Sequence, residues 1–186
     1  MNVLIYPGTF DPIHRGHIDA LRGAMREKDY DKIYVLLQTN RFKNSTMFTY
    51  EARLQFIIDA LNLNDMGKVD VIETDSPYLY DALQNADVFT EIIKFGNVVD
   101  ILVGDDTMTS IEKWFKFDII KGYVRFVVVQ RLMTFDAIYA TANRIFNRFN
   151  IIQSINDVST NFTSTGIRYW IGQELKDFMW KSKSLY

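Results

Sequence analysis

The sequence predicts a doubly wound α/β fold, in which a parallel sheet carries helices on both faces. Two observations support this prediction. Short apolar runs, such as residues 3–6 and 32–38, indicate buried strands, and segments with helical apolar spacing lie between them. Strands that are covered on both faces show such continuous apolar runs, and their alternation with helices is typical of βαβ units.

The first half of the chain alternates three predicted strands with three predicted helices. In the first helix Ile13, Ile18, Leu21 and Ala24 recur close to the helical period. Thr49 is a candidate N-cap of the second helix, because its hydroxyl can accept a hydrogen bond from a free backbone N–H. We expect strands at residues 3–6, 32–38 and 69–73, and helices at about 13–28, 49–63 and 78–95.

The second half contains the most strand-like run of the chain, residues 124–129, in which five of six residues are apolar. We expect strands at residues 100–103, 124–129 and 151–155, and helical stretches at 104–120, 135–148 and 165–181. Ligands of such sheets bind beyond the carboxyl ends of the strands. The loops that would face this crevice begin at Gly8, Thr39, Thr74 and Gly104.

The composition fits one globular domain over residues 1–186, with a helical tail at about 166–186. Hydrophobic residues make up 48% of the chain and charged residues 24%. No run approaches the roughly 18 apolar residues that a membrane span needs, so we expect a cytoplasmic protein without a membrane partner. The net charge of -2 and the lack of a long basic run argue against a nucleic-acid partner.

Residues 8–17 carry the strongest functional signal. The only two histidines of the chain, His14 and His17, stand three residues apart at the start of a predicted helix, on one face of its first turn. Gly8 lets the backbone turn tightly, and Gly16 removes a side chain where a ligand would approach. A helix N-terminus adds free N–H groups, and Thr9 adds a hydroxyl. These groups together predict a polyphosphate site.

Zinc is the other chemistry that two neighbouring histidines allow. A zinc site needs at least a third protein ligand. The chain has no cysteine and no further histidine, so only carboxylates could complete the site. We therefore expect no metal site built by the protein itself.

Two motifs resemble those of a known superfamily. The segment from Gly8 to His17, GTFDPIHRGH, resembles the GTFDPxHxGH motif of the HxGH nucleotidylyltransferases. Far downstream, residues 163–168, TSTGIR, are similar to the ISSTxIR motif of the same superfamily. The order and separation of the two motifs agree with that superfamily, whose members have a Rossmann-like fold.

The middle of the chain resembles the nicotinate mononucleotide adenylyltransferases within that superfamily. Their GxD turn is similar to Gly104-Asp105-Asp106, and it is followed by a tryptophan, here Trp114. A valine-rich strand then ends in an arginine, here Arg131. Residues 78–83 resemble their SYTIDTL segment. The resemblance covers nearly the whole chain up to Arg168.

This resemblance implies transfer of AMP from ATP to nicotinate mononucleotide, which forms deamido-NAD and pyrophosphate in NAD biosynthesis. ATP is the co-substrate, and Mg²⁺ would be carried by its phosphates. His17 would contact the α-phosphate, His14 the other ATP phosphates, and Thr9 the attacking phosphate. The remaining residues of the implied ATP site are Gly8, Phe10, Lys43, Ser164, Thr165 and Arg168, of which Lys43 would neutralise phosphate charge and Arg168 would bind the leaving pyrophosphate. The implied acceptor site consists of Tyr78, Gly104, Asp106 and Trp114.

Some departures from the family pattern leave the acceptor open. Pro7-Gly8 replaces two glycines and is closer to the phosphopantetheine adenylyltransferases. Residues 40–43 keep the lysine of a PPHK loop but lose its prolines, and Leu79 replaces a threonine. Nicotinamide mononucleotide and phosphopantetheine are the alternative acceptors, and an inactive nucleotide-binding relative that regulates a partner is a further alternative. The sequence leaves the oligomeric state, including a homo-oligomer, undetermined.

Overall fold

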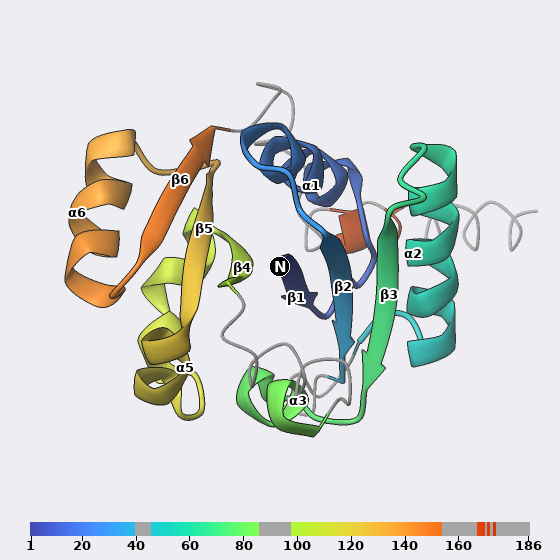
Figure 1. Cartoon of the computed structure of the whole chain (residues 1–186). Coiled ribbons are helices and arrows are strands. Elements are labelled where there is room, and N and C mark those ends of the chain that lie inside the picture. Colours follow the sequence, from blue (N-terminus) through green and yellow to red (C-terminus); the bar gives the residue numbers. More distant parts are fainter. Residues whose placement is uncertain (40–45, 86–97, 154–166, 170, 172, 174–186) are drawn as a thin grey trace, which may run out of the picture.

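The computed structural model describes residues 1–39, 46–85, 98–153, 167–169, 171 and 173. These residues form one six-stranded parallel sheet with the strand order β3-β2-β1-β4-β5-β6 (Figure 1). The strands are β1 (Asn2–Gly8), β2 (Lys32–Gln38), β3 (Val69–Thr74), β4 (Val98–Gly104), β5 (Val124–Gln130) and β6 (Phe149–Gln153). The predicted α/β fold with a doubly wound parallel sheet is confirmed.

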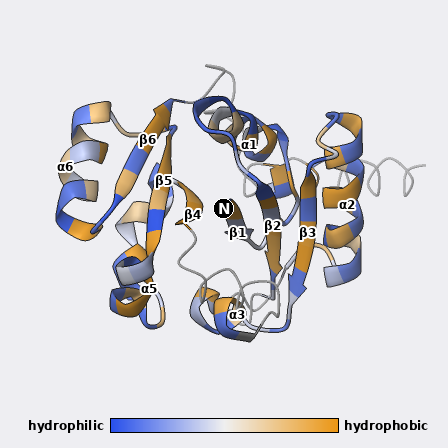
Figure 2. Cartoon of the chain, viewed as in Figure 1, coloured by the Kyte–Doolittle hydropathy of each residue, from blue (hydrophilic) through white to orange (hydrophobic). Residues whose placement is uncertain are grey.

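Helices cover both faces of the sheet. The helical elements are α1 (Arg15–Glu27), α2 (Tyr50–Leu63), α3 (Leu79–Asn85), η1 (Asp105–Thr109), η2 (Ile111–Lys113), α5 (Phe117–Tyr123) and α6 (Phe135–Ile145). Leu21 of α1 and Ile57 of α2 pack with Leu4 on one face. Residues of α3, α5 and α6 pack with Val3 and Ile5 on the other face. In Figure 2 helices α2 and α6 mix hydrophobic and hydrophilic residues, as expected for helices that bury one side.

The two core clusters follow from the alternation of side chains along β1. Val3 and Ile5 point to one face, and Leu4 and Tyr6 point to the other. All four side chains are at most 8% exposed, because the central strand of the sheet has helices above and below it. None of the helices in the described part of the chain is long and apolar enough to cross a membrane.

Some boundaries differ from the sequence prediction. Helix α1 begins at Arg15 and not at Ile13, with His14 as its N-cap. The stretch 104–120 is not one helix, because two short 3₁₀ helices precede α5 and Lys116 adopts a left-handed conformation with φ 55°. Strand β6 begins at Phe149, earlier than expected, and ends at Gln153.

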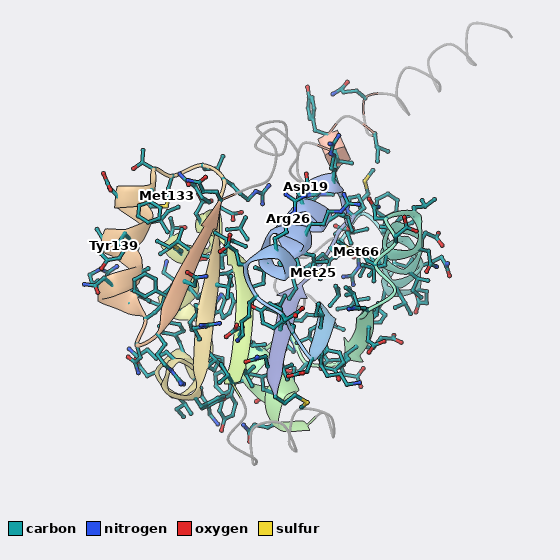
Figure 3. The ribbon with its side chains drawn as sticks, turned by 45° about the horizontal axis from the view of Figure 1, so that its top comes forward. Asp19, Met25, Arg26, Met66, Met133 and Tyr139 are labelled. Atoms are coloured by element: carbon teal, nitrogen blue, oxygen red, sulfur yellow. The ribbon has the colours of Figure 1, made fainter. Side chains whose placement is uncertain are left out.

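The predicted helix 78–95 is observed as α3 over Leu79–Asn85, and its second half lies outside the described residues. The described residues of the predicted C-terminal helix, 167–169, 171 and 173, are helical. In Figure 3 the short helical piece at 167–169 lies beside the start of α1, near Asp19. The division of residues 1–186 into one domain stays a prediction.

A crevice opens where the order of the strands reverses. Strand β1 pairs with β2 as far as Gly8, whereas it pairs with β4 only as far as Ile5. Beyond Ile5 the carboxyl ends of β1 and β4 therefore separate. Pro7 is tolerated in this central strand because it lies beyond the pairing with β4, where no backbone donor is needed on that side. Open α/β sheets bind ligands at this position.

Candidate active site

Two cavities adjoin at the carboxyl ends of β1 and β4. We call the first the crevice cavity; it has a volume of about 260 Å³, and its lining includes Tyr6, Gly8, Thr9, His17, Gly104, Asp106, Arg131 and Arg168. We call the second the aromatic cavity; it has a volume of about 380 Å³ and is lined by Thr9, Gln38, Thr39, Pro77, Tyr78, Leu79, Lys113, Trp114 and Phe115. Thr9 and Trp114 line both cavities.

The turn after β1 forms the floor of the crevice cavity. Phe10 has a positive φ of 45°, and its ring is folded back under Gly8. A Cβ on Gly8 would lie 2.9 Å from Cζ of Phe10, so a larger residue would displace the ring. Buried Arg53 of α2 donates hydrogen bonds to the carbonyl of Thr9 and, over 3.3 Å, to that of Gln38. This arginine fixes the ends of β1 and β2 relative to each other.

The two histidines stack at the start of α1. Their ring centroids are 3.8 Å apart, with 30° between the ring planes. The backbone N–H of His14 donates a hydrogen bond to Nδ1 of His17 over 3.1 Å. A neutral His17 ring must then carry its proton on Nε2. Tyr6 and Phe10 contact the His17 ring edge-on, at centroid distances of 5.9 and 5.0 Å.

Both imidazoles are neutral at pH 7 in the free protein. Burial lowers the pKa of His14 to about 4, with a smaller contribution from the positive charge of Arg131. Burial also lowers the pKa of His17 well below its usual value, assisted by His14 and Arg131. A neutral His17 that is protonated on Nε2 can donate a hydrogen bond to a phosphate oxygen.

Arg168 brings the C-terminal motif to the turn after β1. Its Nη1 donates to the carbonyl of Asp11 and lies 3.4 Å from the Oδ2 of the same residue. The Asp11 carboxylate also accepts backbone N–H groups of Met47 and Phe48, both over 3.0 Å. Asp11 therefore joins three segments that are distant in sequence, and Arg168 lines the same cavity as His17.

The turn after β4 forms the opposite wall. Oδ2 of buried Asp105 accepts hydrogen bonds from the backbone N–H groups of Arg131, Leu132 and Met133 over 2.8, 2.7 and 2.7 Å. These bonds hold the end of β5 next to the end of β4. A Cβ on Gly104 would lie 2.3 Å from Oδ1 of Asp106, so Gly104 leaves room for that carboxylate.

Aromatic rings line the second cavity. Tyr78 and Phe115 have ring centroids 4.7 Å apart. Trp114 follows η2 with an extended backbone and is packed against the core only in part. It lines both cavities. A planar ring could stack there while a group attached to it reaches Thr9.

The structure brings most of the sequence-predicted site residues together. Those in the crevice cavity are Gly8, Thr9, Phe10, His17, Gly104, Asp106, Trp114 and Arg168, and Tyr78 lies in the aromatic cavity. His14 stacks on His17, and it is not among the described residues that line either cavity. The predicted residues Lys43, Ser164 and Thr165 lie outside the described residues.

Sequence reasoning missed three contributors to the site. Arg131 lines the crevice cavity, although an arginine at a strand end is usually a surface residue. Asp105 and Asp11 act through backbone N–H groups that are 26–28 and 36–37 residues away. The place of Asp105 in the GxD-like turn could have indicated its importance, but the sequence predicted a role only for Asp106.

No group of three histidine or carboxylate side chains that could hold a metal ion is found among the residues the structure describes. The polar groups that line the crevice cavity are imidazole, guanidinium and hydroxyl donors and two carboxylate acceptors, Asp11 and Asp106. These groups suit the oxygens of a phosphate ligand that binds together with its own cation.

Comparison with known proteins gives a consistent result. A family model described as cytidylyltransferase-like matches residues 5–168. A probable nicotinate-nucleotide adenylyltransferase from Sulfurovum sp. (strain NBC37-1) is 30% identical over 135 residues, which are 69% of this chain and 68% of that protein. A protein of the same description from Campylobacter fetus subsp. fetus (strain 82-40) is 28% identical over 134 residues, which are 70% of this chain and 72% of that protein.

Among solved structures, a nicotinic acid mononucleotide adenylyltransferase from Plasmodium falciparum, complexed with NaAD, superimposes with a TM-score of 0.75. The match covers 90% of this chain and 82% of that chain, with 18% identical residues. A second structure of the Plasmodium protein, complexed with APC, gives a TM-score of 0.71 at 17% identity and covers the same shares of the two chains. At such low identity these matches establish the shared fold.

Proposed function

Because the chain belongs to the cytidylyltransferase-like family, we propose that it is a nucleotidyltransferase that transfers AMP from ATP to nicotinate mononucleotide. The products are deamido-NAD and pyrophosphate, and the reaction is a step of NAD biosynthesis. The curated relatives that cover about 70% of this chain carry the corresponding description. The observation that supports the proposal most is that His17 and Arg168, from the two distant motifs, line one cavity.

The chemistry of the acceptor needs no general base. A phosphate monoester has its second pKa near about 6, so its oxygens are already mostly ionised at neutral pH. One of these oxygens forms a bond to the α-phosphorus of ATP, while the bond from that phosphorus to the bridging oxygen of the β-phosphate breaks. Pyrophosphate leaves with the electron pair of the broken bond. The protein positions the two phosphates and stabilises the charge.

We assign His17 to the α-phosphate. Its Nδ1 is occupied by the backbone N–H of His14, so the Nε2–H is the donor that remains for a ligand. The ring is held by His14, Tyr6 and Phe10 and needs little reorganisation during the reaction. A fixed donor of this kind stabilises charge that develops on an oxygen in the transition state. His14 contributes by holding His17, and its contact with the remaining phosphates stays a prediction.

Arg168 would bind the leaving pyrophosphate, because its guanidinium offers a planar set of donors to phosphate oxygens. Ser164 and Thr165, which belong to the same motif as Arg168, would contact the outer phosphates, and Lys43 would neutralise phosphate charge. Mg²⁺ would accompany ATP and neutralise part of the triphosphate charge, with few or no ligands from the protein. This division leaves the α-phosphate between His17 and the acceptor.

The acceptor would lie across the junction of the two cavities. Its pyridine ring would stack on Trp114 in the aromatic cavity, next to Tyr78. Its ribose would reach the carboxylate of Asp106 near Gly104, and its phosphate would lie at Thr9, which lines both cavities. The attacking oxygen and the α-phosphorus then meet at the turn after β1.

A panel of acceptors tests the proposal. The protein is incubated with ATP, Mg²⁺ and nicotinate mononucleotide, nicotinamide mononucleotide or phosphopantetheine, and released pyrophosphate is measured. We expect release with nicotinate mononucleotide. Release with phosphopantetheine alone would show that the acceptor is wrong, and no release with any acceptor would favour a nucleotide-binding relative without activity.

A further inference from the structure

The aromatic cavity contains one charged group. Among its described lining residues only Lys113 bears a charge, since the others are aliphatic, aromatic, amide or hydroxyl side chains. We infer that Lys113 determines the choice of acceptor by favouring a pyridine ring that bears a carboxylate over one that bears an amide. This inference rests on the proposed function and names the residue that sets its substrate preference.

The geometry of η2 directs Lys113 toward the cavity. A 3₁₀ helix has three residues per turn, so Ile111, Glu112 and Lys113 point in three directions about 120° apart. Ile111 is 0% exposed and lies in the core. Glu112 turns toward α6, where its two oxygens accept hydrogen bonds from Arg144 over 3.2 and 3.1 Å. The third direction is that of Lys113, which lines the aromatic cavity.

Lys116, the other lysine near Trp114, is engaged elsewhere. This residue has a left-handed backbone conformation and is the N-cap of α5. The Nζ of Lys116 then lies over the rings of Tyr80 and Phe115, 4.2 and 5.1 Å from their centroids. Within the described part of the chain Lys113 has no carboxylate within salt-bridge distance, and Lys116 is not among the residues that line the aromatic cavity. The two lysines are therefore a matched pair for experiment.

The charge of the acceptor distinguishes the two mononucleotides. A nicotinate ring carries a negative carboxylate, and a nicotinamide ring carries a neutral amide of nearly the same shape. Gln38 and Thr39 in the cavity wall can form hydrogen bonds with either group, so they do not select by charge. An ammonium group can distinguish them, because it attracts the negative charge of the carboxylate and the neutral amide lacks that charge–charge attraction.

Steady-state kinetics of Lys113→Gln and Lys116→Gln test this inference. For each protein kcat/KM is measured with nicotinate mononucleotide and with nicotinamide mononucleotide at saturating ATP. We expect Lys113→Gln to lower the ratio of the two values by about tenfold, as for loss of one charge-assisted contact of about 1.4 kcal/mol. The change should be in KM for the acid, with the value for the amide unchanged. Lys116→Gln should keep the ratio of the unchanged protein.

Calorimetric titration of the same three proteins with each mononucleotide gives a second measurement that needs no turnover. If the unchanged protein releases no pyrophosphate, the proposed function fails, and the titration still tests Lys113. A loss of affinity for the acid alone in Lys113→Gln supports the inference. A preference that is the same in all three proteins, or one that falls equally in both variants, overturns it.

Discussion

The backbone N–H of His14 donates a hydrogen bond to Nδ1 of His17 over 3.1 Å. This bond links the two histidines of the first motif in an unequal way. His14 ends the turn as the N-cap of α1, and its backbone determines which nitrogen of His17 carries the proton. The pair therefore acts as one fixed donor, whose Nε2–H belongs to a ring in the wall of the crevice cavity.

Removal of this donor should lower turnover while the fold survives. We expect His17→Ala to lower kcat by about two orders of magnitude or more, as for the loss of one preorganised donor at a developing charge. Pyrophosphate release measures the rate, and circular dichroism checks the fold. A variant with near wild-type turnover would remove His17 from the reaction.

Trp114 should act on the acceptor more than on ATP. We expect Trp114→Ala to raise KM for nicotinate mononucleotide about tenfold, because loss of aromatic stacking costs roughly 0.5–1.5 kcal/mol beyond the buried area. KM for ATP should change much less, and Trp114→Phe should recover most of the affinity. An unchanged KM for the mononucleotide in Trp114→Ala contradicts the stacking.

Replacement of two neighbouring aspartates should have different effects, one on stability and the other on binding of the acceptor. Asp105 is buried and accepts three backbone N–H groups, so Asp105→Ala should lower the free energy of unfolding by on the order of 3 kcal/mol or more. Asp106 is exposed beside Gly104, so Asp106→Ala should change stability by about 0.5 kcal/mol or less. Its effect should be a rise in KM for the acceptor. Urea unfolding measures the stability of both variants, and steady-state kinetics measure their KM for the acceptor. A large loss of stability in Asp106→Ala, together with a raised KM and full stability in Asp105→Ala, would contradict these roles.

Stability should fall as the pH decreases from 6.5 toward 4. The folded pKa of His14 is lowered to about 4 from the usual value of 6.5, so in this window the unfolded chain binds a proton that the folded chain does not. The contribution of the neutral His14 ring to stability is fully present above pH 6.5 and is lost as the pH falls. Between pH 6.5 and 5 we expect His14 to contribute a loss on the order of 1 to 2 kcal/mol.

Urea unfolding at pH 6.5 and pH 5 measures this loss, and His14→Gln is the matched variant because it cannot take up the proton. The loss should be smaller in the variant. An NMR titration that finds the pKa of His14 near 6.5 would contradict the buried, neutral ring.

The strands were predictable because a parallel strand that is covered on both faces has a nearly continuous run of apolar residues. Residues 32–38 coincide with β2, and 124–129 lie within β5. Helix α1 was predictable from its apolar spacing, although its start was not. His14 occupies the N-cap because its backbone is extended there, and residue spacing alone does not reveal that conformation.

The features that were not predictable depend on contacts between segments that are distant in sequence. Asp105 reaches the end of β5 only because β4 and β5 are neighbours in the sheet. The helical stretch expected at 104–120 breaks at Lys116, whose backbone is left-handed and whose side chain lies over Tyr80. Neither contact leaves a periodic pattern in the sequence, so neither could be predicted from the sequence alone.

The proposed reaction requires a triphosphate that lies between the two distant motifs. A crystal structure of the protein with Mg²⁺ and an ATP analogue that cannot release pyrophosphate tests this directly. We expect the α-phosphate within hydrogen-bond distance of Nε2 of His17, with the β- and γ-phosphates at the guanidinium of Arg168. A triphosphate bound outside the crevice cavity, in contact with neither residue, would contradict it.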